Sequence, residues 1–508
     1  MDSSVLQIVM ALLPFAVLFV GFMVFKADAL KLSLVVWVLE VAVCGFLYQM
    51  DIVRIVESSL WGNITLWTGF LVLWTGQVFG SCYRSTGLLN ILLSTLGKIM
   101  PTKEGKSLTL VTVVAGYLGA FNGFATYPVT IPGLKNLGFS GLRAAAAYLV
   151  YFAWNIAFVS LFVAANIAAG VSKIAITEII QVMGLISIPL CVVSTIGFFV
   201  ILQLDLKRKD NIAIAALTMV ANILAVVIFT QVLPDLYLLT LIASATFCLI
   251  AIKLYSKTYD KSAWDEEEGE AHGTKEVIKA FGPLVCCMVL VILMSYPLEG
   301  FVEATTISLS LWGYTPTSIS LANAPGTFVL ITAILCYPFA AKKSSTLAKD
   351  VAAASKRALP SLLTLLCGGA MVQLMMDTSQ ISLLATSMAN LGGEVYTALM
   401  GGLSFLCGMA FGQGMPAVRM LSSMQMSAGP VLGIAPVVLI GLATIVCMGS
   451  ANPIKPSLLK YASSLADVKG QDGQLFNLCL PWQLGALIVC VVMGVVMVAL
   501  GYVPVPLL

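Results

Sequence analysis

The chain has 508 residues, of which 59% are hydrophobic and only 10% are charged, with a net charge of +3 and a mean hydropathy of +1.00. Soluble domains carry about 25% charged residues, so this composition excludes a soluble globular protein and indicates a polytopic integral membrane protein. The small net charge gives no indication of nucleic-acid binding. The 12 cysteines include no CxxC pair that would indicate a zinc site or a disulfide framework.

Apolar runs close to the ~20 residues that cross a bilayer recur along the whole chain. Several are interrupted by glycine, proline or polar residues, so we expect an all-α polytopic membrane protein with about 12–14 transmembrane helices, some of them re-entrant. The first run follows a short segment without a basic region or a cleavage site, and we expect it to be an uncleaved span. The runs lie at 6–25, 30–47, 61–79, 108–125, 144–164, 183–204, 212–232, 236–254, 277–298, 327–341, 359–376, 396–411, 431–447 and 480–500.

The distribution of lysine and arginine predicts the orientation, because these residues favour cytoplasmic loops. They are concentrated at 98–106, 207–209, 253–279 and 342–357, and they are absent from 280–341. We therefore expect the basic segments in the cytoplasm and the N-terminus outside, in the cytoplasmic (inner) membrane of a bacterium.

One hydrophilic segment, 256–276, is expected to be a solvated cytoplasmic linker. It divides the chain into an N-terminal transmembrane repeat, 1–255, and a C-terminal transmembrane repeat, 277–508.

Two stretches place helix-breaking residues inside apolar sequence. Gly116–Leu134 reads GYLGAFNGFATYPVTIPGL and predicts a re-entrant hairpin near 119–135. Gly408–Met420 reads GMAFGQGMPAVRM and predicts another near 408–420. Hydrocarbon cannot satisfy the backbone N–H and C=O groups that a break exposes, so a break persists only where protein or a water-filled cavity surrounds it. Broken helices at mid-membrane form the substrate sites of secondary transporters.

The two halves of the chain carry similar features in the same order, which predicts two inverted repeats, each with one broken-helix hairpin. The alternative is that these matches arise by chance, because the apolar sequences of helical membrane proteins resemble one another when loosely compared. The matched features are 84–96 with 377–391, the hairpin around Gly123 with that around Gly412, 137–139 with 432–434, and Asn155 with Asn452.

Each hairpin carries a proline followed three residues later by a cation, Pro132–Lys135 and Pro416–Arg419. A half-helix that begins near such a proline directs its free N–H groups and its positive dipole end at the hairpin tip, which suits a small carboxylate. Arg419 adds a bidentate donor, and a charge at this depth is costly without a partner. Lys135 is instead expected to extend to the cytoplasmic interface.

Polar residues near the hairpin tips and at the ends of the helices that follow complete the candidate site. The amides and hydroxyls at the helix ends either bind substrate or cap and join helices. The candidate substrate-binding residues are Asn122, Gly123, Thr126, Thr130, Asn155, Gln413, Gly414, Arg419, Ser450 and Asn452.

Carboxylates within the apolar runs are the candidates for ion coupling. Glu40 lies in the middle of LVVWVLEVAVCG, and Asp377 lies at the end of a run. Intramembrane carboxylates are functional or ion-paired, so Glu40 is either a proton carrier or a structural partner. The only histidine, His272, lies in the linker, which excludes a histidine proton relay. No pattern indicates a metal site, a cofactor, an ATP-binding loop or a catalytic nucleophile with its base, so we do not expect an enzyme.

At the hairpins and in the segment after them, the sequence resembles the lactate permease family of bacterial 2-hydroxymonocarboxylate transporters. The similarity extends from about Leu6 to Leu500 in length and in the order of elements. The residues that carry it are 123–126 (GFAT), Pro128, Pro132, 137–139 (LGF), 412–415 (GQGM), 424–425 (MQ), 452–453 (NP) and 470–473 (GQDG).

The resemblance implies a secondary active transporter for a small organic anion such as lactate, glycolate or a related monocarboxylate, with a proton as the coupling ion. The chain departs from the family pattern at Asn122, where an acidic residue is usual nearby, and at Arg419, where the family is apolar. A dicarboxylate or sulfonate substrate and sodium coupling therefore stay open as alternatives, and nothing in the sequence indicates an oligomeric state. A passive channel would need no two-sided gating, and a membrane-embedded enzyme acting on a lipid-linked substrate would need a clustered acid, histidine or metal site.

Overall fold

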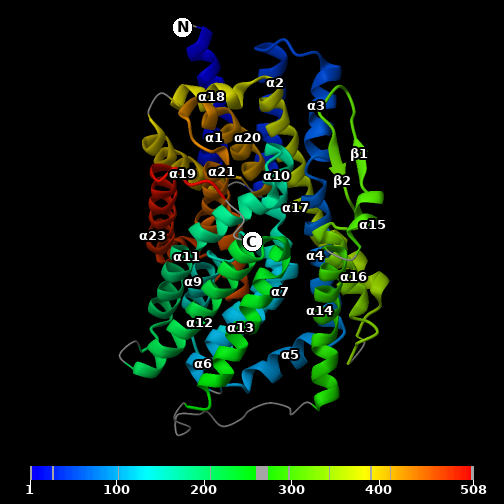
Figure 1. Cartoon of the computed structure of the whole chain (residues 1–508), viewed down its shortest axis with the longest axis vertical. Helices are drawn as coiled ribbons and strands as arrows, with labels where there is room; N and C mark the ends of the chain where they lie inside the picture. Colours follow the sequence, from blue (N-terminus) through cyan, green and yellow to red (C-terminus); the bar gives the residue numbers. More distant parts are fainter. Residues whose placement is uncertain are drawn as a thin grey trace.

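The computed structural model describes residues 3–23, 25, 28–100, 102–205, 208–258, 273–295, 298–341, 344–389, 392–411 and 414–504. Most of these residues are helical, and many of the helices run roughly along the long axis of the molecule (Figure 1). The all-α polytopic membrane class predicted from composition is confirmed. The expected central linker lies largely outside the described residues.

Within the described residues, 8 helical segments are long and apolar enough to cross a bilayer. The remaining apolar runs form helices that are shorter or broken, because glycine, proline and polar residues interrupt them. The 8 segments are α2 (Ala29–Phe46), α11 (Ile176–Leu202), α12 with η2 (Lys209–Val232), η3 with α13 (Pro234–Tyr255), α14 (Thr274–Ser295), α17 (Leu347–Asp377), α21 through η6 (Pro436–Ile454) and α23 (Asp472–Ala499).

The shorter helices fill the space between these segments. In the N-terminal half they are α1 (Ser3–Met23), α3 (Ile52–Ile64), α4 (Trp67–Ser85), α5 (Leu88–Gly97), α6 (Lys103–Leu108), η1 (Thr109–Val114), α7 (Ala115–Phe121), α8 (Gly123–Asn136), α9 (Gly141–Phe152) and α10 (Val159–Ser172). In the C-terminal half they are α15 (Glu299–Ala304), α16 (Pro325–Leu335), α18 (Gln380–Ala389), α19 (Gly393–Ala410), α20 (Gly414–Leu432) and α22 (Pro456–Leu465). The long segment Pro436–Ile454 consists of α21 (Pro436–Ile445), η5 (Val446–Ala451) and η6 (Asn452–Ile454).

A small β-hairpin between α15 and α16 is the one piece of sheet in the described part of the chain. Strands β1 (Ile307–Leu309) and β2 (Thr317–Ile319) pair antiparallel, with Ser308 opposite Ser318. The hairpin lies along one side of the molecule, beside α3 (Figure 1). The sequence pattern predicts only helices and does not indicate this β-hairpin.

The order of elements in the N-terminal half recurs in the C-terminal half. Helices α4, α5, α7, α8 and α9 are followed by the long α11, and helices α17, α18, α19, α20 and α21 are followed by the long α23. The two short helices α5 and α18 lie at opposite ends of the molecule (Figure 1). Opposite placement is what an inverted repeat requires, and the inverted relation of the two halves stays a prediction.

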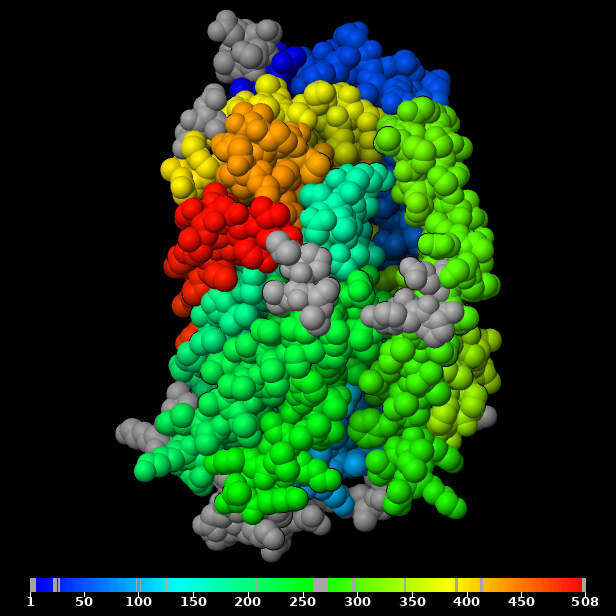
Figure 2. Space-filling view, viewed as in Figure 1, coloured from blue at the N-terminus to red at the C-terminus, as the bar shows by residue number. Residues whose placement is uncertain are grey.

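The centre of the molecule is closely packed, while the outer helices expose apolar side chains. Every residue of α21 after Pro436 is buried within the protein. By contrast, α23 exposes Leu484, Ile488, Val492 and Val496 at a spacing of four residues, which forms one apolar stripe along the helix. On the face seen in Figure 2, helices α10 to α14 cover the middle and lower part, with α23 at the left edge and α18 and α20 above. This arrangement suits a protein whose outer helices contact lipid.

Candidate functional site

The first predicted break lies between α7 and α8, at Asn122. This residue is extended (φ −156°, ψ 109°), and its side-chain oxygen accepts a hydrogen bond from the backbone N–H of Phe124 at 3.0 Å. Asparagine is a favoured helix cap, because its short side chain satisfies an N–H that the first turn leaves free. Thr126, one turn into α8, donates to the Gly123 carbonyl at 2.6 Å and accepts from the Tyr148 hydroxyl. The sequence Asn-Gly therefore ends one helix and starts another inside the protein.

The second predicted break lies between α19 and α20. The chain is extended at Phe411 (φ −72°, ψ 130°), and α20 begins at Gly414. Gly412 and Gln413 lie outside the described residues, so the predicted role of Gln413 is not placed. The first turn of α20, including Pro416, is buried.

Two further breaks lie close to the first two. Between η5 and α22 the chain forms the short 3-10 turn of η6, and Lys455 is then extended (φ −64°, ψ 142°) before Pro456 starts α22. In the first turn of α10, Ser160, Leu161 and Phe162 are left-handed, with φ of 54°, 52° and 60°. A left-handed residue with a side chain costs roughly 1–2 kcal/mol, and such strain clusters at functional sites.

All four breaks contribute to one small internal cavity. Its volume is about 50 Å³, which holds a few water molecules, since one water needs ~10–15 Å³. The N-terminal ends of α8 and α20 both reach it, at Gly123 and Gly414. The residues that line it are Gly123, Phe124, Tyr127, Phe152, Ile156, Val159, Ser160, Val163, Gly414, Met415, Met448, Asn452, Lys455 and Leu458.

A buried cation gives this cavity its charge. Lys455 is only 3% exposed, and its Nζ lies 6.0 Å from the centroid of the Phe124 ring. The side-chain oxygen of Asn452 and the hydroxyl of Tyr127 are buried without a hydrogen-bond partner among the described residues. Two helix N-termini add their positive dipole ends. The arrangement suits a small anion that also accepts hydrogen bonds.

The predicted substrate-binding residues fall into two groups around this cavity. Gly123, Gly414 and Asn452 line it. Asn122, Thr126, Thr130, Asn155 and Ser450 are buried but do not line it. In the second group the hydroxyl of Thr130 and the side-chain oxygen of Asn155 lack a partner among the described residues. Ser450 instead donates to the Val446 carbonyl of its own helix, at 3.0 Å.

Arg419 does not line the cavity. It is 2% exposed, and its guanidinium donates to the Gly369 carbonyl at 3.3 Å and to the side-chain oxygen of Gln373, both on α17. Gln373 in turn donates to Asp377 at 2.7 Å. The side chain of Gln373 therefore links Arg419 to Asp377 by hydrogen bonds, and these contacts join α20 to α17.

Asp377 stands at the centre of a polar cluster at the end of α17. Its carboxylate accepts hydrogen bonds from Ser58 and from the Tyr314 hydroxyl, and Arg54 Nη2 lies 3.9 Å away. Tyr314 belongs to the turn between β1 and β2 and stacks on Trp61, with centroids 5.1 Å apart. Burial and the hydrogen bond to Asp377 raise the pKa of Tyr314 to about 12, so the phenol stays protonated and donates.

Glu40 lies in the middle of α2 and is fully buried. Its Oε1 accepts from Gln380 Nε2 at 2.5 Å and from Cys44 Sγ at 3.4 Å. Its Oε2 has no hydrogen-bond partner within the described chain. Gln380 also donates to Thr378, the residue after Asp377, so the surroundings of the two carboxylates are adjacent.

Lys455 and Tyr127 are not among the residues that the sequence predicts for the site. The break at Asn452–Pro453 with a lysine two residues later was a usable signal, because a cation at membrane depth marks a functional position. Tyr127 gave no comparable signal, since aromatic residues are common in apolar segments.

Helices that break inside the protein around a small cavity with a buried cation define this molecule as a multi-pass membrane transporter. The chain belongs to the L-lactate permease family, whose model matches residues 7–504. It is therefore a secondary transporter of small organic anions.

Solved transporter structures show a distant likeness. The YdaH transporter of Alcanivorax borkumensis is 16% identical, with 87% of this chain and 88% of that chain covered and a TM-score of 0.44. MtrF of Neisseria gonorrhoeae, from a class of antimetabolite efflux pumps, is 15% identical, with 87% and 84% covered and a TM-score of 0.43. No curated protein sequence matches the chain significantly.

Proposed function

We propose that the protein imports a small monocarboxylate, such as lactate or glycolate, across the cytoplasmic membrane in symport with protons. The observation that carries this proposal is the meeting of two helix N-termini and Lys455 at one small cavity. Helix N-termini with a buried cation favour an anion, and the small volume favours a substrate of few atoms.

The cavity residues divide naturally between the two ends of such a substrate. The carboxylate accepts from Lys455 and from the free N–H groups in the first turns of α8 and α20. A hydroxyl on the neighbouring carbon donates to the side-chain oxygen of Asn452, for which no described residue is a hydrogen-bond partner. The walls from Phe152, Ile156 and Val159 accept the apolar remainder.

Proton coupling is assigned to Glu40, with Asp377 as the neighbouring carboxylate. One oxygen of Glu40 is buried without a partner among the described residues, which favours a protonated state during part of the cycle. The contacts from Asp377 through Gln373 to Arg419 join this region to α20, whose N-terminus reaches the cavity. A change of protonation therefore has a physical route to the substrate site.

Purified protein in proteoliposomes tests the proposal. Uptake of L-lactate, glycolate, a dicarboxylate and a sulfonate is measured with an imposed proton gradient and, separately, with a sodium gradient. Accumulation of a monocarboxylate driven by protons is the expected result. Accumulation driven only by sodium would show that sodium, and not the proton, is the coupling ion. Preference for the dicarboxylate or the sulfonate would show that the substrate is not a monocarboxylate. Uptake that only equilibrates under both gradients would indicate a passive channel.

A further inference from the structure

Two arginines lie together at the contact between α4 and α17, outside the cavity. Arg84 lies in the last turn of α4, and Arg357 lies one third of the way along α17, where it donates to Ser81 of α4. Both residues are exposed, and the charge of Arg357 acts on that of Arg84. The positive charges of both arginines also act on the Tyr461 side chain of α22.

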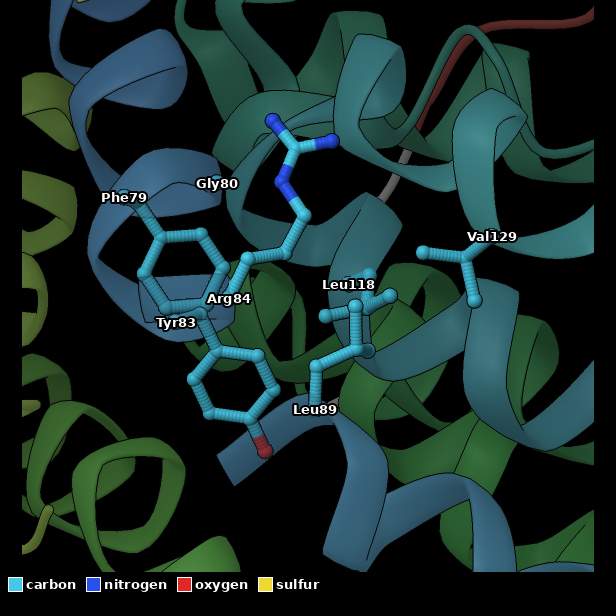
Figure 3. A pocket seen from close by; sticks show the side chains of 7 residues that line it. All are labelled: Phe79, Gly80, Tyr83, Arg84, Leu89, Leu118 and Val129. Atoms are coloured by element: carbon cyan, nitrogen blue, oxygen red, sulfur yellow. The ribbon is translucent and has the colours of Figure 1, made fainter. Parts of the chain in front are cut away.

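The stem of Arg84 is held in place, while its charged end stays accessible. Phe79, Leu118 and Val129 line the space beside the stem, and the guanidinium points away from Tyr83 and Leu89 (Figure 3). Packing the methylene groups against apolar neighbours fixes an arginine without covering its charge. The orientation of the guanidinium is therefore set by α4, α7 and α8.

Neither arginine is neutralised by an ion pair with a described residue. Within the described residues no carboxylate lies within 4 Å of Arg84 or Arg357. Asp350 acts on Arg84 from a greater distance, but its Oδ2 accepts from Ser85 and Tyr337. Two like charges placed together repel each other, and an anion between them relieves the repulsion.

The arginine pair is connected to the cavity by two aromatic rings. Tyr461 lies beside Tyr127, with ring centroids 6.1 Å apart, and Tyr127 lines the cavity. Tyr461 also belongs to α22, the helix that begins directly after Lys455. An anion at the arginine pair is thus separated from the cavity by Tyr461 and Tyr127.

We propose that Arg84 and Arg357 form a second binding site for the transported carboxylate, which Tyr461 and Tyr127 separate from the cavity. This inference rests on the proposed function, since it takes the substrate to be a small organic anion. From Arg84 the chain leads into α5, which lies with α6 at one end of the molecule (Figure 1), and the lysine and arginine distribution assigns that end to the cytoplasm. The pair captures the anion on that side and delivers it to, or receives it from, the cavity.

Transport measured from each face tests the proposal. Intact cells give the KM at the outer face, and inverted membrane vesicles give the KM at the inner face, with the panel anion that the wild type takes up fastest. Arg84→Gln and Arg357→Gln are expected to raise the inner KM by about three- to fivefold, the effect of one exposed charge, and to leave the outer KM unchanged. Lys356→Gln is the matched control, because Lys356 is an exposed cation on the same helix. It should change neither KM.

A further variant neutralises Arg357 without removing it. Ala353 is exposed one turn before Arg357, so Ala353→Glu places a carboxylate beside the guanidinium and should also raise the inner KM. An unchanged inner KM in this variant or in the glutamine variants would overturn the proposal. The measurements are repeated in vesicles of zwitterionic lipid alone, and an effect that disappears there would assign the pair to an anionic lipid head group instead. A wild type that takes up no anion of the panel would refute the proposed function itself, before any variant is compared.

Discussion

Lys455 and Phe124 face one another in the cavity, with Nζ 6.0 Å from the centroid of the ring. Phe124 belongs to the first turn of α8, and Lys455 precedes α22, more than three hundred residues later. The contact brings the break of the N-terminal half against a break of the C-terminal half. A ligand held there touches both halves, so a movement of one half relative to the other changes its binding.

Replacement of Lys455 should weaken substrate binding. Lys455→Gln keeps a polar side chain of similar length and removes the charge, and a hydrogen bond to a charged partner contributes roughly 1.5–3 kcal/mol. We therefore expect the Kd for the carboxylate, measured by calorimetry in detergent, to rise about ten- to a hundredfold. Lys460→Gln, at an exposed position of α22, is the control. Well-folded Lys455→Gln protein with an unchanged Kd would remove Lys455 from the site.

Replacement of Arg419 separates the two roles that the residue can have. The sequence pattern predicts that Arg419→Ala weakens binding about ten- to a hundredfold and that Arg419→Lys restores only part of it. The contacts with Gly369 and Gln373 predict instead a lower thermal stability, because truncation leaves buried acceptors on α17 without a donor, at about 1–3 kcal/mol each.

Because Arg419 does not line the cavity, we expect the loss of stability to be the larger effect. Thermal unfolding in detergent and calorimetric binding, measured on the same preparation, decide between the roles. Unchanged stability with a weakened Kd would place Arg419 at the substrate.

Much of this architecture could be predicted from local sequence, and the partners of the site residues could not. The breaks at Asn122 and before Gly414 follow from asparagine, glycine and proline within apolar runs, because these residues end helices wherever they occur. The contact of Arg419 with Gln373 depends instead on how α20 packs against α17, which no local pattern specifies. The left-handed turn at Ser160 could not be predicted either, since no glycine occupies it. The β-hairpin was missed because its strands have only three residues each.

Replacement of Glu40 tests the coupling assignment. Glu40→Gln keeps the shape of the side chain and an acceptor for Gln380, but it cannot release a proton. If Glu40 carries the coupled proton, gradient-driven accumulation in proteoliposomes should be abolished while substrate exchange continues. Glu178→Gln, in the first turn of α11, is the control. Full concentrative uptake by Glu40→Gln would leave the residue a structural partner of Gln380 and Cys44.

The close approach of α4 to the first break gives a test that touches no charged group. A Cβ added at Gly76 would lie 2.7 Å from Cγ and 2.9 Å from Cβ of Asn122, so Gly76→Ala must displace the residue that caps α8. Overpacking of this kind costs typically 1–3 kcal/mol, although alanine is favoured over glycine within a helix by about 1 kcal/mol. We expect Gly76→Ala to lower the rate of uptake at least severalfold, because the N-terminus of α8 moves with Asn122.

Gly402→Ala supplies the comparison for Gly76→Ala. Gly402 lies in α19, and a Cβ there would meet no atom within 4 Å, so the substitution gains helix propensity without a clash. Its uptake should equal that of the wild type and its thermal stability should be equal or slightly higher. If both alanine variants transport like the wild type, the cap at Asn122 tolerates displacement, and the position of the α8 N-terminus is not what limits binding in the cavity.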